Sequence, residues 1–280
     1  MRINNNTGAL NAQRNLNINN NAVANKMEKL SSGNQINRAA DNAAGLAISE
    51  KMRTQILGAM QASRNTQDAV SLIQVAEGGL QSLQGMFQRA RELAVQSANG
   101  TNDDAVDRAA LQGEFENIVA EVDDTATTTQ FNGMNVLDGT NSPITIQTGA
   151  NAEDTVNIDI GAMTAGELLN FAGENYDPAT DVNIASTNAA STSLGTLDNA
   201  INDISMQRAE LGAMQNRLEF RMQALDIQAE NVTAAESRIR DTDMAKMMSE
   251  LTAKNILQQA SNAMLAQANA RPQSIVGMLG

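Results

Sequence analysis

The chain has 280 residues, enough for one large domain or for two or three small ones, and its net charge is −13. With 19 basic against 32 acidic residues it lacks the basic stripe that attracts nucleic acids or anionic membranes, which argues against both partners. Histidine and cysteine are absent, which excludes catalysis by either side chain, disulfide scaffolds and thiolate zinc sites.

Aromatic residues make up only 2% of the chain, so we expect a core of Leu, Ile, Val, Met and Ala with little else. Such a core is typical of thin helix-on-helix seams rather than a large globular interior. No constellation of carboxylates stands out, so we expect no enzyme activity, metal or cofactor. The opening MRINNNTGALNAQ has no apolar core and no run of 18 apolar residues occurs, so we expect neither a cleavable signal peptide nor membrane insertion.

The two ends of the chain carry weak helical signals. Ten of the first 25 residues are asparagine, which is a poor helix former. Apolar residues nevertheless keep helical spacing at both ends, and near the C-terminus they do so up to Pro272. These residues are Leu16, Val23, Met27, Leu30, Leu251, Leu257, Met264 and Leu265. We expect each end to fold only when it packs on the other and on further copies of the chain.

Two long segments keep a heptad pattern. The first follows alternating steps of four and three from Ile48 to Ala94, which predicts a helix over about 43–98. The second runs from Leu197 to Ile239 and can serve as its coiled-coil partner. The predicted rod core seam contains Ile73, Leu80, Leu83, Phe87, Leu211, Leu218 and Leu225. Gly78, Gly79 and Gly85 within the first segment predict a tight packing surface for another helix.

Shorter elements are predicted between the long helices. Leu111 to Val122 marks a third helix, with Asp103 and Asp104 in its first turn. The stretches ITIQT and TVNIDI, after an Asn132-Gly133 turn, predict a small β-hairpin. Thr164 and Glu167 form a potential capping box for a short helix. The polar residues 172–193 are expected to form a surface loop.

The predicted fold is therefore mainly α: a long antiparallel coiled-coil rod with a small β-hairpin element, plus paired terminal helices. We predict three domains. Residues 1–42 and 243–280 form the terminal coiled coil with its connecting segment. Residues 43–140 and 191–242 form the rod, and residues 141–190 form the hairpin and a short variable surface region.

Several ordered motifs lie near the two ends of the chain. Near the N-terminus they are MRINNNTGAL, KLSSGNQINRAADNAAGLAISEKMR, QRARELAVQSANGT and TQFNGMNVLDG. Near the C-terminus they are LGAMQNRLEF, NVTAAESRIRDTDMA and NILQQASNAMLAQAN. Together these motifs resemble those of bacterial flagellins, and the resemblance covers roughly residues 1–140 and 195–276. The short, unmatched middle suggests a flagellin with little or no outer variable domain.

The resemblance implies a homo-polymeric filament subunit that serves motility. Its terminal helices would form an inner tube, joined to an outer layer of rod helices through the stretch LSSGNQINRAADNAAG. It also implies export of the unfolded chain by the flagellar type III system to the extracellular flagellum. The implied partners are an export chaperone at the C-terminal segment, the filament cap protein and the hook-associated junction proteins.

The stretch QRARELAVQSANGT is similar to the site at which Toll-like receptor 5 recognises many flagellins. The matching positions are Arg89, Leu93 and Glu114. Two other interpretations stay open at this point. A hook–filament junction protein shares the terminal patterns, and a soluble coiled-coil binding module would share the heptads.

Overall fold

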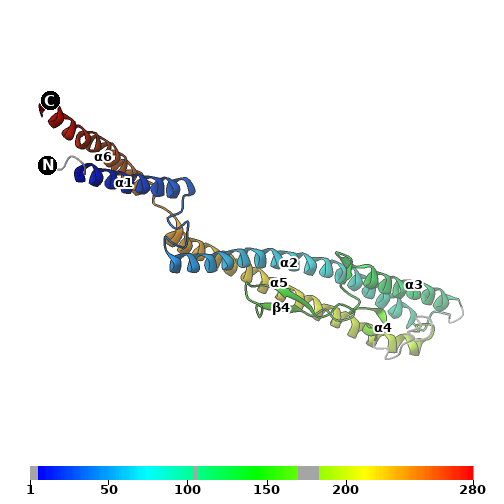
Figure 1. The fold of residues 1–280 in the computed structure, drawn as a ribbon. Coiled ribbons are helices and arrows are strands. Elements are labelled where there is room, and N and C mark those ends of the chain that lie inside the picture. The colour runs from blue at the N-terminus through cyan, green and yellow to red at the C-terminus, as the bar shows by residue number, and fades with distance from the viewer. Residues whose placement is uncertain (1–5, 104–105, 170–182, 280) are drawn as a thin grey trace. The chain divides into compact units, whose positions relative to one another are not determined.

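The computed structural model describes residues 6–103, 106–169 and 183–279 (Figure 1). The chain divides into two compact units. The terminal unit contains Met1–Ile56 and Glu230–Gly280, and the rod unit contains Leu57–Ala229. Long helices dominate both, which confirms the predicted mainly α fold.

In the terminal unit, α1 (Thr7–Ser32) lies side by side with α6 (Met244–Leu279) (Figure 1). Asn6 caps α1, because its side-chain oxygen accepts the backbone N–H of Ala9 at 3.1 Å. Gly33, at φ 72°, ends the helix in the left-handed conformation that glycine adopts most easily. The asparagine-rich segment is thus a helix of 26 residues. Packing against α6 overrides its low intrinsic propensity.

Helix α6 continues past Pro272 to Leu279, whereas the sequence predicted an apolar helical face only up to that proline. A proline removes one backbone donor, but residues beyond it can still form their own turns.

The rod unit is built on α2 (Ala43–Ser97) and α5 (Thr187–Arg240), each of which also contributes residues to the terminal unit. All seven residues of the predicted rod core seam are at most 4% exposed. The helix α3 (Asp107–Thr128) adds Phe115, Val119 and Val122 to the same core. This helix begins at Asp107, so Asp103 precedes its first turn, contrary to prediction, and Asp104 lies outside the described residues. Asp107 instead supplies the first-turn carboxylate.

Two small antiparallel hairpins follow α3. In the first, β1 (Gln130–Phe131) and β2 (Met134–Asn135) flank the predicted turn, where Asn132 and Gly133 have φ of 52° and 79°. In the second, β3 (Ile144–Gln147) pairs with β4 (Thr155–Ile158). The alternating residues Val156, Ile158 and Ile160 turn inward and are buried.

The short helix α4 (Ala165–Leu168) is capped differently from the prediction. Thr164 occupies the N-cap position, but its side chain makes no capping bond. The carboxylate of Asp123, in α3, accepts the backbone N–H of Ala165 at 2.7 Å. Partial burial raises the pKa of Asp123, and this hydrogen bond opposes the rise. A cap from 42 residues away cannot be read from local spacing.

Two further predictions need correction. Residues 172–182 of the predicted loop lie outside the described residues, and α5 already begins at Thr187 because Ala190 and Ser193 are buried. A methyl group added at Gly79 would lie 2.6 Å from Leu137 Cδ1 and 3.1 Å from the side chain of Thr129, so the neighbours of this glycine are the segment after β2 and the C-cap residue of α3 rather than the face of another helix.

Candidate functional site: surfaces of the terminal helices and the rod

The seam between α1 and α6 is half polar. Helix α1 packs along α6, and the apolar side chains of these helices that are at least partly buried include Leu16, Val23, Leu30, Leu251 and Leu265. Hydrogen bonds alternate with them: Asn19 Nδ2 donates to Ser261 Oγ at 2.9 Å, and Asn6 Nδ2 donates to the carbonyl of Ala268 at 2.8 Å. Lys26 and Glu250 form an ion pair. Polar groups matched in this way fix the register of two helices.

The outer faces of the same two helices are rich in exposed apolar side chains. Three predicted assembly residues, Met27, Leu257 and Met264, are 55%, 47% and 64% exposed. Further members of this set, which we call the outer apolar residues, are Leu10, Ile18, Met244, Met248 and Ile256. A soluble monomer rarely exposes apolar side chains so densely, and such surfaces mark interaction sites.

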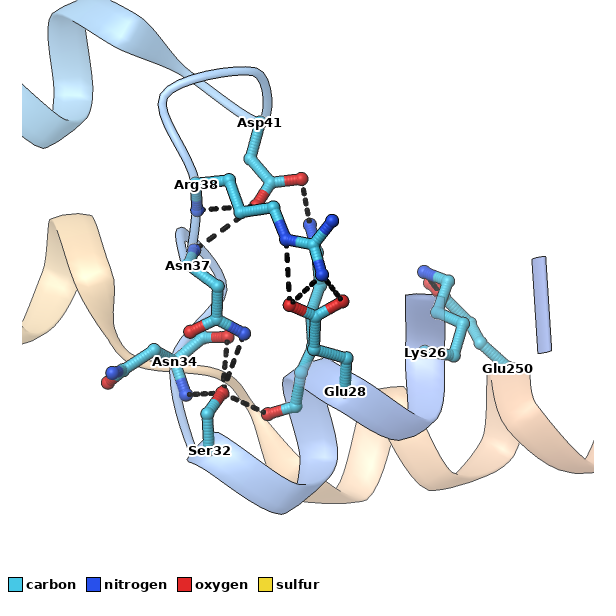
Figure 2. Close-up of polar contacts among 9 residues, drawn as sticks. Lys26, Glu28, Ser32, Asn34, Asn37, Arg38, Asp41 and Glu250 are labelled. Atoms are coloured by element: carbon cyan, nitrogen blue, oxygen red, sulfur yellow. Dashed lines mark hydrogen bonds and ion pairs between the residues drawn. The ribbon is translucent and has the colours of Figure 1, made fainter. Parts of the chain in front are cut away.

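The stretch that joins α1 to α2 is held by a polar network (Figure 2). One oxygen of Asp41 accepts the backbone N–H groups of Asn37 and Arg38, both at 3.1 Å. Arg38 forms a two-pronged ion pair with Glu28, at 3.0 and 3.1 Å. Ser32 Oγ accepts the side-chain amide of Asn37 at 2.8 Å. These contacts fix the backbone conformation of the stretch between α1 and α2, although its sequence contains no reactive side chains.

This stretch also pairs with the chain segment that runs from α5 to α6. The backbone N–H of Gln35 donates to the carbonyl of Arg240 at 2.6 Å, and that of Thr242 donates to the carbonyl of Gly33 at 2.9 Å. Asn34 and Asp241 form an antiparallel bridge between the two segments. Both connections of the terminal unit are therefore tied to each other, and we call them together the junction.

Asp41 is the electrostatic centre of the junction. The hydrogen bonds from the Arg38 and Asn37 backbones favour its charged form, and Lys29 Nζ lies 3.7 Å from its other oxygen. Together they hold the pKa of Asp41 below its ordinary value. The carboxylate is thus ionised at neutral pH, when it can bind these partners.

On the rod, the three positions matched to receptor contacts differ in environment. Arg89 and Glu114 are exposed and lie 2.7 Å apart, and Glu92 adds a second ion pair at 3.1 Å. The carboxylates raise the pKa of Arg89, with the hydrogen bonds to Glu114 as the largest cause. Leu93 is only 1% exposed and belongs to the rod core. Arg89 and Glu114 thus form a charged surface pair, whereas Leu93 is not accessible on that surface.

Sequence reasoning missed Arg108, which is 4% exposed. Its guanidinium donates to the carbonyls of Ser97 and Asn99, both at 2.8 Å, and so caps the C-terminus of α2. A basic residue 11 positions after a helix end gives no local capping signal.

Within the described ranges, no group of three or more acidic side chains could hold a metal ion. No helix there is long and apolar enough to cross a membrane.

Comparisons with known proteins place the chain in a family. Residues 3–142 match the bacterial flagellin N-terminal helical region, and residues 194–279 match the C-terminal helical region. The chain is 49% identical to a flagellin of Halalkalibacterium halodurans, with both chains covered completely. It is 47% identical to the flagellar filament 31.3 kDa core protein of Treponema maltophilum, again over both whole chains.

A solved structure, the flagellin of Bacillus cereus, is 34% identical to this chain. The match covers 62% of this chain and 94% of that one, with a TM-score of 0.49. The matches to the two flagellin regions and the whole-chain identity to curated flagellins show that the chain belongs to the bacterial flagellins, a family of structural filament proteins rather than enzymes, and is a short form with no large variable domain.

Proposed function

We propose that this chain polymerises through its paired terminal helices into the filament of a bacterial flagellum, outside the cell. The observation that carries this proposal is the set of outer apolar residues on α1 and α6. Burying one such side chain contributes about 1.5–3 kcal/mol, so several residues in contact with several neighbours can offset the cost of ordering the ends.

The domain assignment forms part of the proposal. Residues 1–42 and 243–280 would line the central channel as the inner tube, and residues 43–140 and 191–242 would surround it. The hairpin and variable region, residues 141–190, would lie with the rod layer. The junction would then set the geometry between the two layers, and its paired backbones and the Arg38–Glu28 ion pair support such a role.

Export and capping are proposed from the resemblance to flagellins. The chain would leave the cell unfolded through the type III apparatus, with a chaperone on its C-terminal segment, and would fold beneath the cap protein. The first subunits would dock on hook-associated junction proteins. The seam between α1 and α6 supports this sequence of events, because many of its contacts are polar and the two helices bury little apolar area between them. They are therefore only weakly stable until further copies cover their outer faces.

Seeded polymerisation tests the filament proposal. Purified monomer with short filament seeds and salt should give long tubes of uniform diameter in negative-stain electron microscopy. Met27→Ser, on the outer face of α1, should slow their growth. Met134→Ser, an exposed methionine on β2, should leave growth unchanged.

Two results would point elsewhere. Defined dimers or tetramers under all conditions would favour a soluble coiled-coil module. Layers that stop after one turn on the seeds would favour a hook–filament junction protein.

A second candidate role is activation of Toll-like receptor 5 through the exposed residues Arg89 and Glu114, whereas Leu93, at 1% exposed, is buried away from a partner. The ion pair of Arg89 with Glu114 supports it, since an exposed charged pair that links α2 to α3 can steer and orient a partner. Arg89→Ala should raise the concentration for half-maximal activation of receptor-bearing reporter cells, and Arg64→Ala on the same helix should not. Equal potency of the two variants would remove Arg89 from the contact.

A further inference from the structure

Helix α5 has two apolar faces. Its rod-core side chains recur every seven residues at Ile204, Leu211, Leu218 and Leu225, each at most 4% exposed. Two residues after each of these comes a second set: Met206, Ala213, Phe220 and Ile227. Two residues turn an α-helix by about 200°, so this second set, the α5 outer stripe, lies on the face opposite the core.

The α5 outer stripe is open to solvent. Met206, Phe220 and Ile227 are 62%, 71% and 60% exposed. Phe220 contrasts with Phe87 and Phe115, which are at most 1% exposed in the core. A helix with apolar residues on opposite faces is normally buried on both, and among the described residues nothing covers the outer stripe as its composition requires.

Helix α2 carries the complementary surface. Its buried residues Ala69, Ala76 and Leu83 also recur every seven residues, and two positions after them come Ser71, Gly78 and Gly85. A methyl group added at either glycine would meet no atom within 4 Å. This α2 small face is therefore smooth and uncovered. Glycine disfavours a helix interior, and no neighbour within the described chain explains either residue.

We propose that the α5 outer stripe of one molecule docks on the α2 small face of a second copy of this chain. The large side chains of the α5 outer stripe repeat every seven residues. They would pack into the shallow depressions at Gly78 and Gly85, which are spaced by the same interval. A close approach of helices is the use that small residues serve in such seams.

A second copy is the occupant because the chain itself supplies both halves. Two different surfaces of one molecule form a heterologous contact, which builds an open helical array rather than a closed dimer. The ion pair of Arg91 with Asp198 and the hydrogen bond of Ser63 with Asp226 show that α2 and α5 run antiparallel within the rod. Neighbouring copies in one orientation would thus repeat an antiparallel pairing that the chain already makes internally. This inference rests on the proposed filament function and specifies one lateral contact within it.

Thiol cross-linking tests the contact directly, because the chain contains no cysteine of its own. The double variant Phe220→Cys with Gly78→Cys, assembled on wild-type seeds and treated with a short bismaleimide, should give a ladder of covalent oligomers on denaturing gels. If the docked helix lies one heptad further along α2, the pair Phe220→Cys with Gly85→Cys should give the ladder instead. Unassembled monomer should give no ladder.

The control pair is Phe220→Cys with Gly113→Cys, since Gly113 is a helical glycine on α3 that also has no atom within reach of an added methyl group. A ladder of equal strength from this control would overturn the proposal. Filaments that form normally but give no ladder from either α2 glycine would also overturn it while leaving the filament function intact. Failure of the wild-type chain to grow on seeds would instead remove the filament function.

Substitution gives a second, independent readout. Gly78→Leu should raise the critical monomer concentration for assembly about tenfold or more, because the side chain fills the docking face. It should not lower the Tm of the monomer, because the added side chain meets free space there. Gly113→Leu should change neither assembly nor Tm. Unaltered assembly of the Gly78→Leu variant would contradict the proposed contact.

Discussion

At the scale of single residues, Asp41 shows how one carboxylate shapes the junction. It binds two successive backbone N–H groups and lies near Lys29. Its folded pKa is lowered from 3.8, so the stabilisation that it gives is present above that value and is lost as the pH falls through the folded pKa. The junction should therefore loosen in acid before the rod core, which buries almost no charge.

Asp41→Ala should speed hydrogen exchange at the amides of Asn37 and Arg38 at pH 7, because both lose their acceptor. The difference from the wild-type chain should shrink as the pH is lowered below the folded pKa, where the wild-type carboxylate is protonated as well. Exchange measured by mass spectrometry at pH 7 and at a series of lower pH values, with rates corrected for intrinsic exchange, checks this. Asp68→Ala, an exposed carboxylate on α2, is the control, and equal exchange in both variants at pH 7 would contradict the assigned role.

Arg108 allows a test of stability at the same scale. Arg108→Met would leave the carbonyls of Ser97 and Asn99 without their buried donor, which should cost about 2–3 kcal/mol. Arg108→Lys should recover only part of this, because an ammonium group cannot match the planar fork of a guanidinium. Urea denaturation followed by circular dichroism measures the loss. Arg64→Met, at an exposed site on α2, should stay within about 0.5 kcal/mol of the wild-type chain.

At the scale of elements, the terminal helices depend on each other more than the rod helices do. Deleting residues 1–30 removes nearly all of α1 and leaves the seam face of α6 uncovered. We expect no filaments from the truncated chain, while the rod unit should keep its helical circular dichroism because its core lies within Leu57–Ala229. Filaments grown from truncated monomer on wild-type seeds would refute the assembly role of α1.

The long elements were predictable because their signal is repeated many times. From Ala59 to Ala94 the expected seam positions of α2 are buried without exception, since one heptad pattern over many turns permits a single buried face. For α1 and α6, the apolar spacing did not distinguish the face that packs in the seam from the face that is exposed to solvent. Leu16 and Met27 were assigned to one stripe, yet Leu16 faces the seam and Met27 the solvent.

Features that depend on residues distant in sequence could not be predicted. From the sequence alone, Asn19 is only a poor helix former. Its role in the structure depends on Ser261, 242 positions away, whose hydroxyl oxygen accepts a hydrogen bond from the Asn19 side-chain amide. The cap that Asp123 gives to α4 and the cap that Arg108 gives to α2 have the same origin. Charged surface pairs such as Arg89 and Glu114 were recognised only through family resemblance, because an exposed ion pair leaves no mark on apolar periodicity.

At the scale of the whole molecule, net charge opposes assembly. Each copy carries −13, so any polymer brings many negative charges into a small volume. The apolar faces of α1, α5 and α6 must outweigh this repulsion, and salt screens it over about 8 Å at physiological ionic strength. Side-chain burial itself changes little with moderate NaCl, so the two contributions can be separated by experiment.

We therefore expect the rate of seeded growth to rise as NaCl is added, because screening lowers the repulsion while burial stays nearly constant. Light scattering at fixed monomer and seed concentrations measures this rate. Sodium sulfate at the same ionic strength provides the control: screening alone gives equal rates, whereas strengthened apolar burial gives faster growth in sulfate. A rate that falls steadily with NaCl would mean that attraction between opposite charges on neighbouring copies outweighs the net repulsion. Contacts such as the exposed Arg89–Glu114 surface would then have to be reassigned from a receptor to the filament itself.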